Sequence, residues 1–503
     1  MEKFDWKVLQ NGSDIRGVAI KGVPGEDVNL DESKAEVLGR AFYQYLENKG
    51  KKNMSVALGM DSRISGPSLG QSFSRGFRAM GGRVVDCGMA STPAMFMATQ
   101  FSEFNVSAGV MLTASHLPFN RNGLKFFTKE GGLNKGDISE ILDIAANTTF
   151  LDSPNPGLLE KADLISRYAI DIVNNIREKV NLPGNFERPL QGLKIIVDAG
   201  NGAGGFFADK VLAPLGADTS GSQFLEPDGL FPNHVPNPED DAAMDAICMA
   251  VLKNQADLGI IFDTDVDRAA VVDAGGQPVN RNALIALISA IILEEHPGTT
   301  IVTDSITSEG LASFIQDKLG GKHHRYKRGY KNVINEAIRL NTGGEESWIA
   351  IETSGHAALK ENYYLDDGAY LVSKVLIKLA QLHLRNESIS DLIGELQHPL
   401  ESVEYRLKIL HKDFAEYGMT VIKELTELVS AEEGWVPEQQ NFEGLRIRCT
   451  SENQRGWFLL RLSLHDPVMP LNIESDLEGG TETICRRLYK ILSRFDQLDL
   501  SSF

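Results

Sequence analysis

Val110-Met-Leu-Thr-Ala-Ser-His-Leu-Pro-Phe-Asn-Arg-Asn-Gly-Leu-Lys-Phe-Phe127 joins two apolar runs through a polar turn. The first run, 109–112, is typical of a buried strand, and the Pro-Phe-Asn-Arg-Asn-Gly segment predicts a turn before the second run. We therefore expect Ser115, His116 and Lys125 to lie together at the tip of a strand. A serine there can act as a nucleophile or carry a phosphoryl group, and the other two side chains can move protons or bind anionic oxygens.

This stretch alone leaves a simpler interpretation open, which is a polar loop with a hydrogen-bonded serine and a surface histidine. It does not contain the Gly-x-Ser-x-Gly elbow of hydrolases, so it gives little support to that mechanism.

The surrounding chain repeats a strand–loop–helix unit. The segments 56–80, 194–215 and 300–319 each contain an apolar strand that ends in aspartate, a loop rich in Gly or Ser, and a helix. Alternating strands and helices predict parallel sheets, and a period of over a hundred residues indicates three similar domains rather than a solenoid. The helix predicted for 31–50 begins with a capping box, Ser33-x-x-Glu36. From residue 401 onward, one helix and alternating strands predict a smaller α+β domain.

The composition is that of an ordinary globular protein of 503 residues, long enough for three or four domains. A net charge of -19 argues against binding to nucleic acid or an anionic membrane surface. The four cysteines form no close pair, which favours a reducing compartment over a disulfide framework or a zinc site. No apolar stretch is long enough to span a membrane.

An acidic turn follows the apolar strand 258–262 and contains Asp263, Asp265 and Asp267. Three carboxylates at alternate positions repel one another unless a cation neutralises them, and oxygen ligands suit a divalent ion such as Mg²⁺. A calcium-binding EF-hand loop does not fit, because Arg268 stands where glycine is needed and Ala274 where glutamate is needed. A solvated acidic turn remains the simpler alternative.

The loop Gly200-Asn-Gly-Ala-Gly-Gly205 satisfies the Gly-x-Gly-x-x-Gly pattern, with Asp218 downstream. A dinucleotide site is therefore an alternative. It is disfavoured because the corresponding units of the first and third predicted domains lack such glycines.

Several of these motifs resemble those of the phosphohexomutases, the superfamily of phosphoglucomutases and phosphomannomutases. Thr-Ala-Ser-His-x-Pro with Asn-Gly-x-Lys is similar to the family's active-serine loop. Three other motifs also resemble family motifs: Gly-Ser-Asp-Ile-Arg-Gly at 12–17, the aspartate turn, and Glu-Thr-Ser-Gly-His at 352–356. All four motifs occur along the chain in the family's order. The resemblance implies three α/β domains with mixed, mostly parallel sheets, then a smaller α+β domain, around a central cleft. The expected domains, which carry the serine, metal-binding, sugar-binding and phosphate-binding loops in turn, are 1–162, 163–282, 283–400 and 401–503.

The resemblance also implies roles for individual residues. Ser115 would be the phosphorylated catalytic residue and, with Asp263, Asp265 and Asp267, a ligand of one Mg²⁺ ion. The remaining candidates are His116 and Lys125 for acid–base work, and Arg16 and Arg268 for steadying charge near the reacting group. The residues expected to bind substrate are Lys331, Glu352, Ser354, His356, Arg461 and Ser463.

The chain departs from the family pattern at the last of these loops. Arg461, Ser463 and Pro467 match the family's phosphate loop, but Leu464 and His465 replace a small residue and a threonine. Pro470 stands where we expect a later family arginine. The resemblance therefore predicts an altered and weaker site for the non-reacting phosphate.

The sequence thus predicts a Mg²⁺-dependent phosphohexomutase that interconverts hexose 1-phosphate and hexose 6-phosphate, with glucose ahead of mannose. A phosphoserine and a hexose 1,6-bisphosphate, which also serves as activator, would be the intermediates. The alternatives are a hexose (glucose) 1,6-bisphosphate synthase, a phosphoglucosamine mutase, and a non-catalytic sugar-phosphate sensor. The expected partner is a phosphorylated hexose, and we expect binding neither to nucleic acid nor to a membrane. The protein is expected to be a monomer or homodimer in the cytoplasm or plastid stroma.

Overall fold

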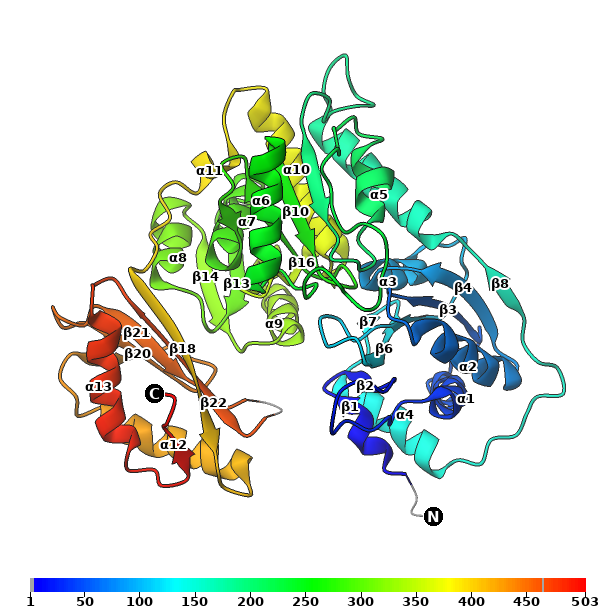
Figure 1. The fold of residues 1–503 in the computed structure, drawn as a ribbon, viewed down its shortest axis with the longest axis horizontal. Coiled ribbons are helices and arrows are strands. Elements are labelled where there is room, and N and C mark those ends of the chain that lie inside the picture. The colour runs from blue at the N-terminus through cyan, green and yellow to red at the C-terminus, as the bar shows by residue number, and fades with distance from the viewer. Residues whose placement is uncertain (1–3, 464–465) are drawn as a thin grey trace. The chain divides into compact units, whose positions relative to one another are not determined.

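The computed structural model describes residues 4–463 and 466–503, and the chain divides into two compact units (Figure 1). Unit 1 comprises Met1–Asn280 with Ser354–Ile389, and unit 2 comprises Arg281–Thr353 with Ser390–Phe503.

Unit 1 begins with a mixed sheet of eight strands in the order β1-β2-β6-β5-β3-β4-β8, with β7 paired to β6. Strands β3, β4, β5 and β8 are parallel neighbours, whereas β6 runs antiparallel to β5 and to β2. The strands are β1 (Gln10–Asn11), β2 (Asp14–Val18), β3 (Ser55–Met60), β4 (Arg83–Met89), β5 (Ala108–Leu112), β6 (Arg121–Thr128), β7 (Gly131–Gly132) and β8 (Leu159–Lys161). The helices of this part are η1 (Trp6–Leu9), α1 (Glu32–Asn48), α2 (Gly66–Ala79), α3 (Thr92–Gln100) and α4 (Lys135–Asn147).

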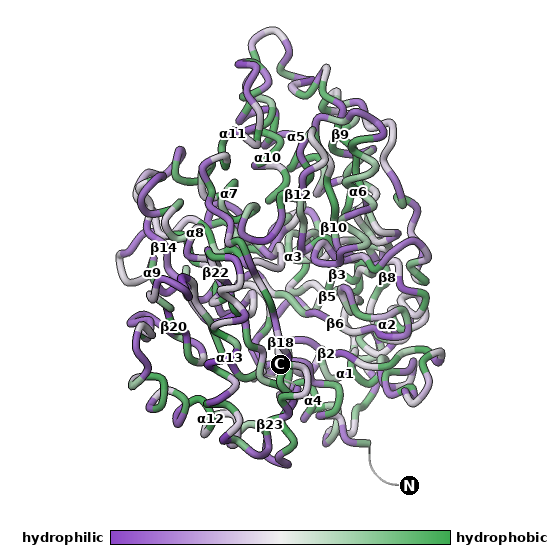
Figure 2. Tube along the Cα trace, turned by 60° about the vertical axis from the view of Figure 1, so that its left-hand side comes forward, coloured by the Kyte–Doolittle hydropathy of each residue, from purple (hydrophilic) through white to green (hydrophobic). Residues whose placement is uncertain are grey.

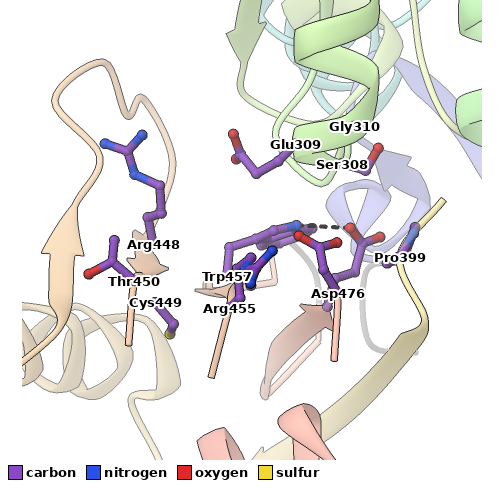
Figure 3. Close-up of a pocket in the computed structure, with 12 residues that line it drawn as sticks. Ser308, Glu309, Gly310, Pro399, Arg448, Cys449, Thr450, Arg455, Trp457 and Asp476 are labelled. Atoms are coloured by element: carbon purple, nitrogen blue, oxygen red, sulfur yellow. Dashed lines mark hydrogen bonds between the residues drawn. The ribbon is translucent and has the colours of Figure 1, made fainter. Parts of the chain in front are cut away.

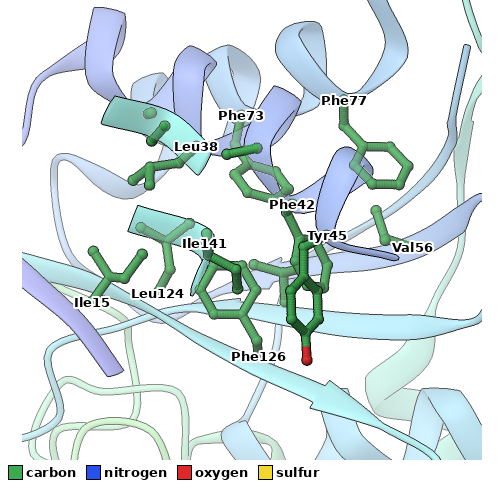
Figure 4. Packing of buried hydrophobic residues seen from close by; sticks show 14 of the residues in the cluster. Ile15, Leu38, Phe42, Tyr45, Val56, Phe73, Phe77, Leu124, Phe126 and Ile141 are labelled. Atoms are coloured by element: carbon green, nitrogen blue, oxygen red, sulfur yellow. The ribbon is translucent and has the colours of Figure 1, made fainter. Parts of the chain in front are cut away.

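Helices α1, α2 and α4 bury one face of this sheet (Figure 4). The rings of Phe42 on α1 and Phe126 on β6 lie 4.6 Å apart between centroids, and Phe73 and Phe77 of α2 complete the aromatic centre. Helix α3 packs on the opposite face, where a Cβ at Gly109 would lie 2.3 Å from the carbonyl oxygen of Met95. The two packed faces fix the carboxyl end of β5, from which the serine loop projects.

A second sheet in unit 1 has the order β12-β11-β10-β9. Strand β10 is parallel to β9 and forms an antiparallel hairpin with β11, so the acidic turn lies at the tip of this hairpin. These strands are β9 (Ile195–Asp198), β10 (Leu258–Phe262), β11 (Ala269–Asp273) and β12 (Pro278–Val279). The accompanying elements are α5 (Leu164–Val180), η2 (Phe207–Leu212), α6 (Asp241–Asn254), the antiparallel strands β16 (Ala357–Leu359) and β17 (Leu365–Asp366), η4 (Lys360–Asn362) and α10 (Gly368–His383).

Unit 2 contains three parallel strands in the order β14-β13-β15 and an antiparallel sheet in the order β19-β20-β21-β22-β18-β23. The first group consists of α7 (Arg281–Glu295), β13 (Thr300–Asp304), α8 (Glu309–Ser313), η3 (Phe314–Lys318), β14 (Lys322–Tyr326), α9 (Tyr330–Thr342) and β15 (Ile349–Ile351), and the short α11 (Ile389–Leu392) follows α10. The second consists of β18 (Glu401–Ile409), α12 (Phe414–Val429), β19 (Trp435–Pro437), β20 (Leu445–Cys449), β21 (Gly456–Leu460), β22 (Val468–Ser475), α13 (Gly480–Leu492) and β23 (Leu498–Asp499).

Mixed and parallel sheets with helices, followed by an antiparallel sheet domain, confirm the predicted fold class. Figure 2 shows hydrophobic and hydrophilic segments alternating along the trace. Among the described residues, no helix is long and apolar enough to cross a membrane.

Candidate active site

Ser115 lies in the loop that leaves β5, and its side chain meets the acidic turn of the second sheet. The Ser115 Oγ donates a hydrogen bond of 3.0 Å to Asp263 Oδ2, although the two residues are far apart in the sequence. The backbone of Ser115 is left-handed, with φ of 50°, and its N–H donates to Thr113 Oγ1. A non-glycine residue in this conformation is strained, and such strain gathers where the surrounding structure fixes a functional side chain.

The three aspartates of the turn are buried and converge. One carboxylate oxygen from each of Asp263, Asp265 and Asp267 lies within 4.8 Å of the others. Thr92, at the start of α3, donates its hydroxyl proton to Asp265 Oδ2 and its backbone N–H to the Asp265 carbonyl oxygen at 2.8 Å. The first sheet's helix α3 thereby holds the turn that the second sheet supplies.

Two cationic side chains lie within this acidic group. Lys125 Nζ donates to Asp265 Oδ2 at 2.9 Å and to Asp267 Oδ2 at 2.6 Å. Arg268 Nη2 donates to Asp263 Oδ2 at 3.1 Å and to Ser115 Oγ at 3.2 Å. Lys125 belongs to β6 of the first sheet and contacts the aspartates, whereas Arg268 follows the aspartates and contacts Ser115. Each cation therefore links the sheet that carries Ser115 to the turn that carries the aspartates.

The carboxylates respond differently to these charges. Burial, with the charges of Asp267 and Asp265, raises the pKa of Asp263 well above its ordinary value. Burial also acts to raise the pKa of Asp267, but Lys125, His356 and Arg268 hold that pKa below its ordinary value. The two carboxylates therefore differ, because Asp263 favours its protonated form more than a free carboxyl does and Asp267 favours its charged form.

The donor set fits a divalent cation. Asp265 Oδ1 and Asp267 Oδ1 are buried and accept no hydrogen bond from any residue that the structure describes. Buried carboxylate oxygens without a donor are costly, and Mg²⁺ prefers ligands of this kind. The three aspartates, with the hydroxyl of Ser115, offer four oxygen ligands suited to such an ion.

Two histidines near Arg268 differ in protonation. His116 Nδ1 accepts a hydrogen bond of 2.7 Å from Arg268 Nη2, and burial with the charges of Arg268 and Arg16 lowers the pKa of His116 to about 3. His356 Nδ1 lies 2.5 Å from Asp366 Oδ2; burial alone would lower its pKa, but Asp366 and Asp267 raise it to about 9. At neutral pH His116 is a neutral acceptor and His356 an imidazolium.

The remaining predicted residues of unit 1 are Arg16 and Ser354. Arg16, on β2, is partly buried, and its guanidinium donates to Asp14 Oδ2 at 3.0 Å. Ser354 is buried, and within the described part of the chain its Oγ has no hydrogen-bond partner. Unit 1 therefore brings together the predicted catalytic and metal-binding residues, with His356 beside them.

The other predicted residues belong to unit 2. Glu352 Oε1 accepts a hydrogen bond of 2.6 Å from the N–H of Gly329, just before α9, where Lys331 lies. Burial and the charge of Arg328 lower the pKa of Arg461.

The described residues at the two ends of the predicted phosphate loop of unit 2 pair through backbone hydrogen bonds. The N–H of Arg461 donates to Pro470 O at 3.1 Å, and the N–H of Ser463 donates to Val468 O at 3.0 Å. The predicted departures at Leu464 and His465 lie outside the described residues.

A separate pocket of about 330 Å³ in unit 2 contains none of the predicted site residues (Figure 3). It lies between Ser308–Gly310 and the antiparallel sheet, where Trp457 Nε1 donates to Glu474 Oε2 at 2.8 Å.

The glycine-rich loop that suggested a dinucleotide site packs against the acidic turn. A Cβ at Gly202 would lie 2.7 Å from Thr264 O, and the N–H of Ala203 donates to that same oxygen at 2.8 Å. Close backbone packing accounts for glycine at this position.

Sequence reasoning missed four residues that the structure places at this site. Thr92 and Asp366 contact the aspartates and His356, Asn237 Oδ1 accepts from Arg268 Nη1 at 3.1 Å, and Arg63 contacts the serine loop. Only Arg63 had a sequence signal, the polar Asp-Ser-Arg loop directly after a predicted strand.

Comparisons with known proteins agree with this fold. Family models described as phosphoglucomutase/phosphomannomutase, alpha/beta/alpha domains I, II and III match residues 7–152, 169–276 and 280–399. A phosphoglucomutase of Neisseria meningitidis is 31% identical over 466 residues, which are 92% of this chain and 93% of the relative. A phosphomannomutase/phosphoglucomutase of Pseudomonas putida is 30% identical and covers 93% of each chain.

A solved structure of a phosphoglucomutase/phosphomannomutase family protein from Burkholderia thailandensis has a TM-score of 0.78 and 26% identity, covering 96% of each chain. Fold and relatives together define an enzyme of the mutase class, an intramolecular phosphotransferase. The chain belongs to the phosphoglucomutase/phosphomannomutase family, as the resemblance of its motifs predicted.

Proposed function

We propose that this protein is a Mg²⁺-dependent phosphohexomutase that interconverts hexose 1-phosphate and hexose 6-phosphate, with a phosphoryl group carried on Ser115. The observation that carries the proposal is the 3.0 Å hydrogen bond from Ser115 Oγ to Asp263, inside a buried group of three carboxylates. Asp263, Asp265, Asp267 and Ser115 would hold the metal ion. When bound, Mg²⁺ neutralises negative charge on the phosphoryl group.

The reaction proceeds by two transfers. In the first, the bond between phosphorus and Ser115 Oγ breaks, a bond from phosphorus to a sugar hydroxyl oxygen forms, and the hydroxyl proton passes to a base. The resulting hexose 1,6-bisphosphate turns in the site, and its other phosphoryl group returns to Ser115 Oγ by the reverse steps. The same bisphosphate, supplied from solution, phosphorylates an unmodified Ser115 and so acts as activator.

Arg268 is suited to stabilise the leaving oxygen, because its Nη2 lies 3.2 Å from Ser115 Oγ and donates toward it. His116 and Lys125 are the acid–base candidates, and Arg16 steadies charge nearby. His356 adds a protonated imidazole on the Asp267 side of the site, since its pKa is raised to about 9. The arrangement supplies acceptors and donors on both sides of the serine.

The roles proposed for the substrate-binding residues are those that the family resemblance implies. Glu352 and Ser354 would bind sugar hydroxyls, Lys331 and His356 would contact the substrate, and Arg461 with Ser463 would bind the non-reacting phosphate. The relatives' names include both glucose and mannose mutases, so either hexose is a substrate candidate. These relatives come from bacteria, so plastid localisation gains no support from them.

No specific observation favours the three alternatives. The bisphosphate synthase hypothesis depends on Leu464 and His465, which lie outside the described residues, and on Pro470, which is buried in β22. A phosphoglucosamine mutase shares the sugar hydroxyls in question, and a non-catalytic sensor has no need of a serine hydroxyl directed at a carboxylate group.

Replacement of the serine tests the proposal. We expect Ser115→Ala to abolish conversion of glucose 1-phosphate and mannose 1-phosphate, assayed with Mg²⁺ and a trace of the matching bisphosphate, while the circular dichroism spectrum is unchanged. The matched control is Ser102→Ala, an exposed serine in a turn of the first domain, which should retain full activity. A fully active Ser115→Ala protein would overturn the proposal.

A further inference from the structure

We propose that Arg63 is a positioning residue that holds the serine loop in its reactive conformation, an inference that rests on the proposed role of Ser115. The Arg63 guanidinium is buried beneath the loop and donates to four of its backbone carbonyl oxygens. Its Nη2 donates to the carbonyls of Ser115 and of Leu117, the latter at 2.6 Å. Its Nη1 donates to Pro118 O at 2.8 Å and to Arg121 O at 2.9 Å.

The end of strand β3 anchors this arginine. Arg63 and Asp61 are each 1% exposed, and Arg63 Nε lies 3.3 Å from Asp61 Oδ2. The backbone N–H of Arg63 donates to Asp61 Oδ1 at 2.9 Å, and that of Asp61 donates to Leu112 O at 3.1 Å. Because Leu112 is the last residue of β5, the arginine is fixed to the strand from which the serine loop leaves.

The part of unit 1 that contains the second sheet packs against the same arginine. The Phe231 ring centroid lies 5.3 Å from the guanidinium carbon of Arg63. A Cβ at Gly229 would lie 2.5 Å from Ser62 O and 2.6 Å from Ile64 N, so only glycine fits this contact. The segment 228–231 is therefore packed against the Arg63 turn without room for another side chain.

The same connecting segment also reaches the other arginine of the site. Asn237, six residues after Phe231, accepts the hydrogen bond from Arg268 Nη1. Ser115 is thus held from two directions, with Arg63 on its carbonyl and Arg268 on its hydroxyl. Both arginines contact residues between 228 and 240. These contacts couple the serine loop to the domain that carries the aspartates.

Physical chemistry explains why an arginine is required here. Ser115 is left-handed, and the carbonyl groups of the loop converge on one point, an arrangement that is unfavourable without a donor for each oxygen. A guanidinium offers five donors in a fixed plane, whereas the lysine ammonium is compact and has three. Arg63 does not touch the serine hydroxyl, so it acts through the direction in which that hydroxyl points.

Arg63→Lys and Arg63→Ala test the inference. A displacement of the reacting atoms by about 1 Å can cost about 100-fold in rate, so we expect kcat for Arg63→Lys to fall by about that factor with KM unchanged. The rate of Ser115 phosphorylation by hexose 1,6-bisphosphate should fall in parallel. Millimolar guanidinium ion should restore part of the activity of Arg63→Ala, which a general loss of stability does not explain.

The matched control is Arg83→Lys, because Arg83 also donates to loop carbonyls, those of Phe104 and Asn105, in the same domain. Its kcat should stay at the wild-type value. If wild type forms phosphoserine, Ser115→Ala is inactive and Arg63→Lys turns over at the wild-type rate, the inference on Arg63 is overturned while the proposed function stands. An active Ser115→Ala protein instead overturns the proposed function.

A further variant tests the positioning role of Arg63 if both Arg63 variants fail to fold. Phe231→Ala removes the ring over the guanidinium but no hydrogen bond, and it should lower kcat several-fold without changing KM. A folded Phe231→Ala protein with wild-type kcat would then overturn the inference.

Discussion

Replacing Lys125 with methionine tests whether the carboxylates of the acidic turn need a nearby positive charge. Lys125 is 6% exposed, and its ammonium donates to Asp265 and Asp267, which are 0% and 3% exposed. Removing one partner of a buried charge pair costs about 3–5 kcal/mol, because the remaining charge stays buried and unpaired. We expect the free energy of unfolding of Lys125→Met, measured without divalent cations, to fall by about this amount.

Mg²⁺ should then restore stability to the variant. An ion that binds only the folded state stabilises it by about 2.7 kcal/mol at a concentration of 100 times its dissociation constant. Without the lysine charge the three carboxylates attract a cation more strongly, so Mg²⁺ should raise the urea midpoint of Lys125→Met more than that of the wild type. Urea titrations at several Mg²⁺ concentrations, followed by circular dichroism, measure both effects.

Lys374→Met is the matched control, because Lys374 is 1% exposed and pairs with Glu361 at 2.9 Å elsewhere in unit 1. This variant should lose stability but gain no more from Mg²⁺ than wild type does. If Lys125→Met is as stable as wild type without divalent cations, the acidic turn does not depend on the lysine charge. If Mg²⁺ stabilises it no more than Lys374→Met, the acidic turn is not a cation site.

Two further predictions concern unit 2. Burial raises the pKa of Glu474 from 4.5 to about 7, so between these pH values the folded protein keeps a proton that the unfolded chain releases, and stability falls as the pH rises through this window. Glu474→Gln should therefore match wild type below pH 4.5 and exceed its unfolding free energy by up to about 3 kcal/mol above pH 7, as measured by urea titration; a difference that does not depend on pH contradicts this. Arg461→Lys should raise KM for the hexose phosphate about tenfold through loss of a charged hydrogen bond to phosphate, whereas the exposed Arg455→Lys should not; equal KM values would count against a phosphate site at Arg461.

The sequence predicted those parts of the site that depend on short local signals. The serine loop follows a buried strand and the acidic turn joins two strands, so apolar runs and turn residues were enough to place both. The contact between these two loops depends on tertiary packing, and only the family resemblance indicated it. Thr92 and Asn237 were missed for the same reason, since each contributes one contact across the structure and has no local pattern.

Helix ends and helix type were less predictable. The expected capping box at Ser33 is wrong, because α1 begins at Glu32 and the Asp31 side chain accepts from the N–H of Lys34. Asp, like Ser, is a strong N-cap residue, and Asp31 lies two residues before Ser33. The helices expected after the second and third repeated strands contain π-helical turns, 207–212 and 314–318, which hydropathy patterns do not distinguish from α-helix.

Following one phosphoryl group shows whether Ser115 carries it during turnover. Dephosphorylated protein should be incubated with glucose 1,6-bisphosphate and Mg²⁺, digested, and analysed by peptide mass spectrometry. We expect a single phosphoryl group on Ser115, which excess hexose monophosphate removes as free bisphosphate forms. Sustained turnover with Ser115 unmodified throughout, or with the phosphoryl group on another residue, would contradict this prediction.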